Sequence, residues 1–235
     1  MITIIGTGHV FNISEQVAFI IKHVWPDAVL VELDESRYVA MTNPSAKTQE
    51  PSKTYKRAAE YQEKMASEYG TSPGSELITA VNAGEMLGSK ILFIDKNAGN
   101  VMERVWEEMP SREKIRYRMS NVKDRFFSKK QTVEQSLDEF AEDEEKYIDD
   151  MRKKFPTLVR MVIDERNEHM ASKIKQAAAD NKNIVVVIGD GHVSAVSKMI
   201  EQETRIIRLR DLMNKERMDS IRRELWTHAG EKDEG

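Results

Sequence analysis

Residues 185–193 read VVVIGDGHV and repeat the opening of the chain, where residues 2–10 read ITIIGTGHV. Over the aligned stretches Ile4–Val10 and Val187–Val193, five of seven positions are identical. In each copy a run of apolar, mostly β-branched residues, typical of a buried strand, leads into a Gly-x-Gly-His turn. This repeat predicts two equivalent structural units, each with a histidine on the loop after its strand.

Each repeated turn is followed by a helix and a second strand. After the first turn, Ser14 is expected to cap a helix whose apolar residues recur at helical spacing as far as Val24, and residues 28–33 form the next strand. After the second turn, an apolar helical stripe precedes a strand at residues 205–209. Such βαβ units imply parallel strands joined by right-handed crossovers.

A further strand is expected at residues 90–94, after a helix at 76–87. The predicted fold is therefore α/β, with a central mixed or parallel sheet built from two repeated βαβ halves and a large helical insertion. The predicted organisation is a single domain over residues 1–212, with a polar loop or lid at 40–75 and the helical insertion at 100–182, followed by a C-terminal helix and tail at 213–235.

Two segments of the insertion carry opposite charge. Residues 111–130 contain eight Lys or Arg against two Asp or Glu, and residues 134–150 contain nine Asp or Glu against one Lys. These segments are interpreted first as two solvated helix faces, and alternatively as a pair of antiparallel helices. A homodimer formed through this charged surface is compatible with either interpretation.

The composition excludes several classes of protein and site. A net charge of −4 gives no overall attraction to nucleic acid or anionic lipid. The chain has no cysteine, so any metal must be held by His, Asp or Glu. No signal peptide is recognised, and the apolar runs are too short to span a bilayer, so a soluble cytoplasmic protein is expected.

Four residues are expected at the carboxyl ends of the strands, where ligands bind in open α/β sheets. They are His9 and His192, on the repeated turns, and Glu32 and Asp95, at the ends of two other strands. Two histidines with one or two carboxylates make a suitable ligand set for a catalytic divalent metal such as Mn, Co or Zn. Taken singly, Glu32 could instead pair with Arg37, and Asp95 could cap a helix that starts near residue 100.

The same turns do not indicate a dinucleotide site. The Gly-x-Gly-x-x-Gly fingerprint requires a third glycine, and Phe11 and Ser194 occupy those positions. The sequence also lacks a P-loop, a nucleophile elbow and a His-Glu-x-x-His helix.

The ordered set of motifs resembles the TraB/PrgY (pheromone-shutdown) family. The resemblance extends over residues 1–212, with a gap at 40–75. It rests on Gly6–Val10, Pro26–Arg37, Ile94–Lys96, Glu103–Arg104, Asp164–Asn167 and Gly189–Val193.

Through this family the chain resembles Tiki-type metalloproteases and, more distantly, the erythromycin esterase/ChaN-like superfamily. The resemblance implies an active centre of two Gly-x-x-His motifs with nearby glutamates. The residues that it implicates are His9, Glu32, His192, Glu165 and Arg166, with Asp95, Asp190, Arg37 and Arg104 as secondary candidates.

The resulting hypothesis is a metal-dependent hydrolase that acts on peptides. His9 and His192 are the expected metal ligands, and Glu32 is a third ligand or the general base. Arg166 is expected to stabilise the oxyanion, and Glu165 to bind the metal or orient an imidazole. Two alternatives remain open: a protein that sequesters a peptide without cutting it, and a metal-free, esterase-like hydrolase.

Overall fold

The computed structural model describes residues 1–8, 11–43, 73–119 and 144–230. Three predictions fall largely outside these ranges: the position of His9, the lid at 40–75 and the pairing of the two charged segments. The prediction of a parallel α/β sheet is confirmed. The order is β3-β2-β4-β1-β5, all neighbouring strands are parallel, and the strands are β1 Ile2–Thr7, β2 Ala28–Val31, β3 Lys90–Phe93, β4 Ile184–Gly189 and β5 Thr204–Ile207.

The two repeated βαβ units are interleaved in the sheet. The strands of the first unit, β1 and β2, lie on either side of β4, and those of the second, β4 and β5, lie on either side of β1. The two glycine-containing strands are therefore central neighbours, with Thr7 opposite Gly189 in the ladder. This order brings the carboxyl ends of β1 and β4 side by side at one edge of the sheet.

The two crossover helices pack on opposite faces of the sheet. Helix α1 (Ser14–Val24) buries Val17, Ile20, Ile21 and Val24 in the same apolar cluster as Val29 and Val31. Helix α12 (Asp190–Ile200) buries Val193, Val196 and Ile200 with Ala28 and Leu30. Because side chains alternate along a strand, these two clusters lie on opposite faces of the sheet. The two βαβ units are therefore related by an approximate two-fold axis that runs along the strands.

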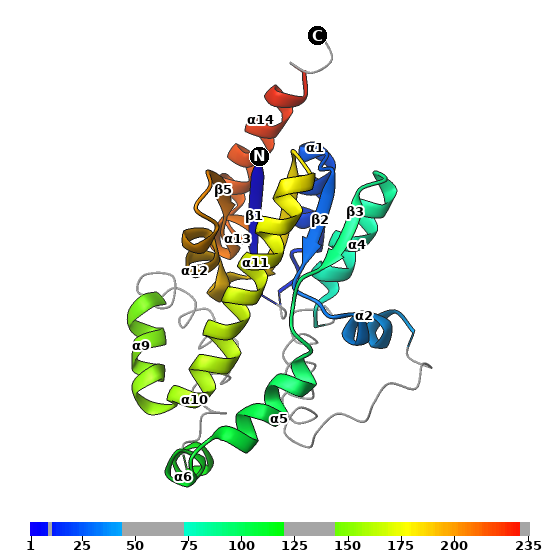
Figure 1. The fold of residues 1–235 in the computed structure, drawn as a ribbon. Helices are drawn as coiled ribbons and strands as arrows, with labels where there is room; N and C mark the ends of the chain where they lie inside the picture. The colour runs from blue at the N-terminus through cyan, green and yellow to red at the C-terminus, as the bar shows by residue number, and fades with distance from the viewer. Residues whose placement is uncertain (9–10, 44–72, 120–143, 231–235) are drawn as a thin grey trace.

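Further helices complete the two layers. Helices α4 (Ser75–Met86), α13 (Leu209–Met213) and α14 (Lys215–Gly230) cover the α1 face. Helix α11 (Glu165–Asp180) packs beside α12 on the other face, where Met170, Ala171 and Ile174 are buried. The C-terminal part of the predicted helical insertion is thus the helix that connects to β4 and forms part of the sheet's own core (Figure 1).

A further group of helices, the outer helical layer, lies beyond the carboxyl edge of the sheet (Figure 1). A small apolar cluster of Val101, Val105, Met109 and Met161 holds part of this layer together. The elements of the layer are α5 Ala98–Glu108, α6 Ser111–Met119, α9 Glu144–Lys154, α10 Pro156–Val159 and a π-helical segment, η1 Arg160–Asp164. Helix α2 (Glu35–Thr42) follows β2 at the same edge. No helix in the described ranges is long and apolar enough to cross a membrane.

Two local predictions differ from the structure. Ser14 is the first residue of α1 rather than its cap, and its Oγ lies 3.4 Å from Oγ of Ser75 at the start of α4. The predicted turn at residues 189–192 is not a loop, because β4 runs to Gly189 and α12 begins at Asp190. His192 therefore lies in the first turn of a helix, and its position is fixed by the strand–helix junction.

Candidate functional site

Three candidate residues meet at the carboxyl ends of neighbouring strands. Glu32 directly follows β2, Asp95 lies two residues after the end of β3, and His192 lies at the start of α12, which directly follows β4. The side chains of Glu32 and Asp95 are 3% and 0% exposed. Two carboxylates this deeply buried require a cationic partner, because a buried unpaired charge costs several kcal/mol, on the order of 3–5.

Arg166, in the first turn of α11, is that partner. Its Nε donates to Asp95 Oδ1 at 2.8 Å, and its Nη2 donates to Asp95 Oδ2 at 2.8 Å and to Glu32 Oε1. Its Nη1 donates to the carbonyl oxygen of Val162 at 3.2 Å and lies 3.3 Å from Nε2 of His192. All five N–H groups of the guanidinium thus face acceptors.

The charge on Arg166 is secured by these contacts. Burial alone would lower the pKa of its guanidinium, but the charges of Glu32 and Asp95 and their hydrogen bonds outweigh burial and raise it above the ordinary value. Asp95 is also 3.5 Å from Nη1 of Arg37. The sequence-based pairing of Glu32 with Arg37 is therefore replaced by Glu32–Arg166 and Asp95–Arg37 contacts.

Asp95 does not cap the next helix. That position is occupied by Asn97, whose side chain accepts from the backbone N–H of Asn100 at 2.9 Å. Asp95 is left to bind Arg166 and to accept from the backbone N–H of Lys96 at 2.8 Å.

His192 is oriented by Asn167. The Oδ1 atom of Asn167 lies 2.6 Å from Nδ1 of the imidazole, and because an amide oxygen only accepts, Nδ1 carries the proton. In the neutral ring, Nε2 then carries the lone pair that faces Arg166 Nη1, and this nitrogen also lies 3.6 Å from Glu32 Oε1. Asn167 is 2% exposed, so this contact is enclosed by the protein.

The second oxygen of Glu32 joins the two halves of the repeat. Glu32 Oε2 accepts from the backbone N–H of Gly189, the last residue of β4. A Cβ at Gly189 would lie 3.2 Å from that oxygen, which is closer than side chains usually pack. A glycine at this position allows the carboxylate to approach the backbone.

A π-helical segment immediately precedes α11, the helix that carries Arg166 and Asn167. Residues 160–164 have π-helical hydrogen bonding, a rare feature that is frequent at functional sites. The carbonyl of Val162 within it accepts from Arg166 Nη1. The segment thereby links the outer helical layer to the residue at the centre of the ionic cluster.

Glu165 and Arg104 belong to a more exposed ionic network. Glu165 accepts from Lys96 at 3.3 Å, from Arg104 at 3.1 Å and from Arg160 at 2.7 Å, and Arg104 and Arg160 also bind Glu108. Burial acts to raise the pKa of Glu165, but the hydrogen bonds from Arg104 and Lys96 lower it overall. The imidazole-orienting role considered for Glu165 is taken at His192 by Asn167.

Within the described part of the chain, Asp190 holds neighbouring elements of the fold together. Arg208 binds it through Nε at 3.0 Å and Nη2 at 2.9 Å, and the backbone N–H of Leu209 donates to it at 2.8 Å. A Cβ at Gly6 would lie only 2.1 Å from Asp190 Oδ1. Asp190 therefore connects β1, α12 and the end of β5.

Sequence reasoning missed the role of Asn167. One signal was available: Asn167 stands at the helical spacing of Met170, Ala171 and Ile174, and is therefore a polar residue on the buried face of α11. Such a residue requires an internal partner, and His192 provides it.

The donor atoms fit part of a divalent metal shell. Ligand distances of about 2.0–2.2 Å place two ligands of one tetrahedral ion about 3.4 Å apart, close to the 3.6 Å between His192 Nε2 and Glu32 Oε1. The guanidinium of Arg166 contacts the same two atoms. Within the described ranges, no three His, Asp or Glu side chains form a metal-binding group, and His9 lies outside them.

The fold and this cluster define a parallel α/β protein with a buried ionic site at the carboxyl edge of its sheet. The chain belongs to the TraB/PrgY/gumN family, which residues 1–205 match. It is similar to an uncharacterized protein of Methanocaldococcus jannaschii, with 26% identity over 215 residues, covering 86% of this chain and 53% of the relative. The chain thus spans about half the length of this relative.

Proposed function

We propose that this chain is a metal-dependent hydrolase of peptide bonds, with an active centre at Glu32, Arg166 and His192 together with His9. The observation that supports the proposal best is the Asn167–His192 contact of 2.6 Å. It fixes the tautomer in which Nε2 has a lone pair directed at Glu32 and Arg166, as a metal ligand or general base requires.

The proposed reaction adds water across an amide bond. The water oxygen bonds to the carbonyl carbon, the C–N bond breaks, and the protons of the water end on the products, a carboxylic acid and an amine. A divalent ion held by His192, Glu32 and His9 would supply Lewis acidity to water and carbonyl. The chain's own groups must position this chemistry and move the protons.

Each described residue has a distinct part in the proposal. Glu32, held by the backbone of Gly189, presents a fixed carboxylate as ligand or proton acceptor. Arg166 is anchored through Nε and Nη2, so Nη1 is the nitrogen with the longest contacts, at 3.2 and 3.3 Å. We assign Nη1 to the developing oxyanion, because turning away from His192 costs it only a weak hydrogen bond.

The experiment compares metal content and peptide cleavage in one set of proteins. Wild type, His9→Ala, His192→Ala and the control His23→Ala, whose ring stacks on Phe19 in α1, are loaded with Mn, Co or Zn and analysed by mass spectrometry. The expected result is about one ion per chain in wild type and His23→Ala, with loss of both ion and cleavage in the other two variants.

Other outcomes separate the alternatives. Peptide binding without cleavage in the metal-loaded protein would replace the proposal with a sequestering protein. Turnover of a simple ester that persists in a chelator would favour a metal-free hydrolase with His192 as general base, supported by the same tautomer.

A further inference from the structure

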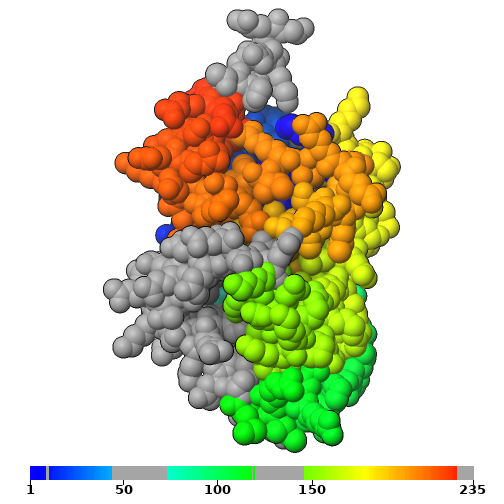
Figure 2. Space-filling view, turned by 90° about the vertical axis from the view of Figure 1, so that its left-hand side faces the viewer, coloured from blue at the N-terminus to red at the C-terminus, as the bar shows by residue number. Residues whose placement is uncertain are grey.

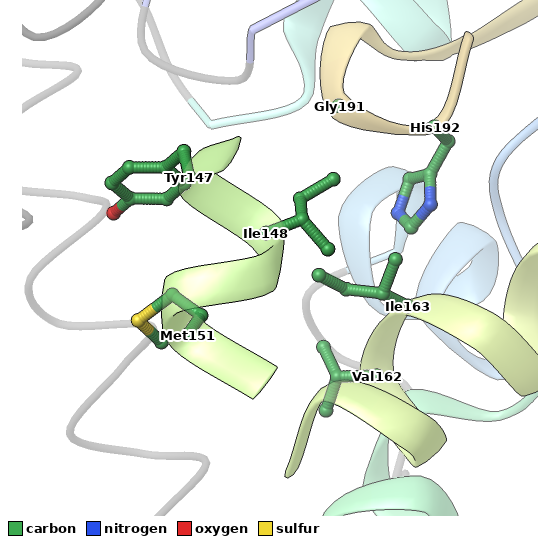
Figure 3. A pocket seen from close by; sticks show the side chains of 7 residues that line it. All are labelled: Tyr147, Ile148, Met151, Val162, Ile163, Gly191 and His192. Carbon is green, nitrogen blue, oxygen red and sulfur yellow. The ribbon is translucent and has the colours of Figure 1, made fainter. Parts of the chain in front are cut away.

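A pocket of about 170 Å³ lies beside His192, on the side of the outer helical layer. Figure 3 shows Ile148 of α9 and Ile163 of η1 pointing toward each other next to the imidazole. The described residues that line the pocket are Tyr147, Ile148, Met151, Val162, Ile163, Gly191 and His192.

The lining of this pocket is apolar. Among the described side chains that line it, only Tyr147 and His192 carry a polar nitrogen or oxygen. A charged group that entered would lose its hydration without gaining a partner from Ile148 or Ile163, whereas an apolar group gains about 25 cal/mol for each Å² removed from water. The pocket therefore selects apolar groups.

The size of the pocket limits what it can hold. A cavity of about 150 Å³ with a similar aliphatic and aromatic lining is large enough for a benzene ring. Pockets that enclose a whole drug-sized ligand are larger, roughly 300–1,000 Å³. The pocket beside His192 thus suits one aromatic or branched aliphatic side chain.

The position of the pocket relates it to the ionic cluster. His192 belongs to both: its ring lines the pocket, and its Nε2 lies 3.6 Å from Glu32. A substrate with an apolar side chain in the pocket would place the adjoining backbone at this nitrogen. Helix α9 lies on the surface of this face, below α12, in the space-filling view (Figure 2).

We infer that this pocket binds an apolar side chain, of the size of leucine or phenylalanine, next to the peptide bond that is cut. The inference rests on the proposed function and adds a substrate class to it. Because one methylene in an apolar pocket changes kcat/KM by roughly 10–200-fold, peptides with Leu or Phe at this position should exceed those with Asp or Lys at least tenfold.

The test uses a peptide mixture digested by the metal-loaded full chain, with cleavage sites read by mass spectrometry. Ile148→Trp, which fills the pocket, should move cleavage toward Gly and Ala, and Ile148→Ala, which enlarges it, toward the larger aromatic residues. Ile115→Trp is the control, because Ile115 is 55% exposed on α6 and the same exchange there leaves the preference unchanged. Circular dichroism verifies the fold of each variant.

The outcomes distinguish this inference from the proposed function. Cleavage by wild type without an apolar preference, or an unaltered preference in both Ile148 variants, overturns the pocket and leaves the hydrolase intact. If no peptide is cut, NMR titration with N-acetyl-leucine amide and N-acetyl-aspartate amide tests whether the pocket binds an apolar side chain. Methyl shifts at Ile148 and Ile163 with the leucine probe alone support the pocket, and no shift with either overturns it.

Discussion

Asn167 Oδ1 and Glu32 Oε1 lie near opposite nitrogens of one imidazole, at 2.6 Å from Nδ1 and 3.6 Å from Nε2 of His192. The two residues come from different parts of the chain, α11 and the end of β2. One fixes the ring and its proton, and the other faces the nitrogen that is left to react. Removing the amide of Asn167 should therefore alter the tautomer of His192 and so the reactivity of Nε2, while Glu32 and Arg166 stay in place.

Asn167→Leu keeps the volume of the side chain and removes the acceptor for Nδ1–H. We expect kcat to fall about 10–100-fold with little change in KM, as when the orienting partner of a metal-ligating histidine is lost. Asn167→Asp retains an acceptor and should keep most of the activity. Nitrogen NMR of His192 checks the cause, since the leucine variant should show a mixture of tautomers. Equal activity and one tautomer in Asn167→Leu would contradict this role.

Arg166→Met should destabilise the fold by about 3–5 kcal/mol, because it leaves the buried Glu32 and Asp95 without their shared cation. Arg166→Lys should rescue only part of this loss, since an ammonium cannot reproduce the two-sided contacts of a guanidinium. Urea denaturation measures the effect. Arg222→Met, which removes an exposed pair with Asp219, is the control and should cost less than about 1 kcal/mol. A similar small loss for Arg166→Met would argue against a charge-balancing role.

Gly6→Ala should destabilise the protein by about 1–3 kcal/mol through overpacking. Its Cβ would lie 2.1 Å from Asp190 Oδ1, an atom that Arg208 and Leu209 hold in place. Gly99→Ala is the matched control, because among the described residues a Cβ there meets only Asn97 Oδ1, and at the longer distance of 3.2 Å. Thermal unfolding compares the two, and equal melting temperatures would show that Asp190 moves aside freely.

The sheet and the cluster at its edge could be predicted from sequence to different extents. The β-branched runs located all five strands, and the repeat indicated that both Gly-x-Gly-His motifs lie at carboxyl ends. The interleaved strand order could not be predicted, because a repeat does not specify which strands become neighbours. The Gly189–Asp190–Gly191 sequence suggested a turn, yet the strand passes directly into α12.

The contacts within the site could not be predicted from sequence patterns, because such patterns relate residues a few positions apart and the partners in this site are far apart in the chain. Arg166 was predicted as a site residue, but its contacts with Glu32 and Asp95 join positions separated by 134 and 71 residues. Glu165 and Asn167 both flank it, and only the helical phase of α11 directs Asn167 toward His192 and Glu165 toward the outer arginines.

The pH dependence of stability should reveal the contribution of Glu165. Its pKa in the folded state is held below the ordinary value of 4.5, since the hydrogen bonds from Arg104 and Lys96 outweigh the burial that would raise it. The folded state therefore binds this proton less readily than the unfolded state. The stabilisation is complete above about pH 4.5 and is lost as the pH falls through the lowered pKa.

Glu165→Gln should accordingly lower the melting temperature at neutral pH. The acid limb of its plot of melting temperature against pH should be shallower than that of wild type, so that the two plots converge in strong acid. The difference in unfolding free energy at pH 7 should stay below about 1 kcal/mol, because the network is partly exposed. Glu103→Gln removes an exposed carboxylate from α5 and is the control, with a limb parallel to wild type. Parallel limbs for Glu165→Gln as well would mean that its ion pairs do not stabilise the fold.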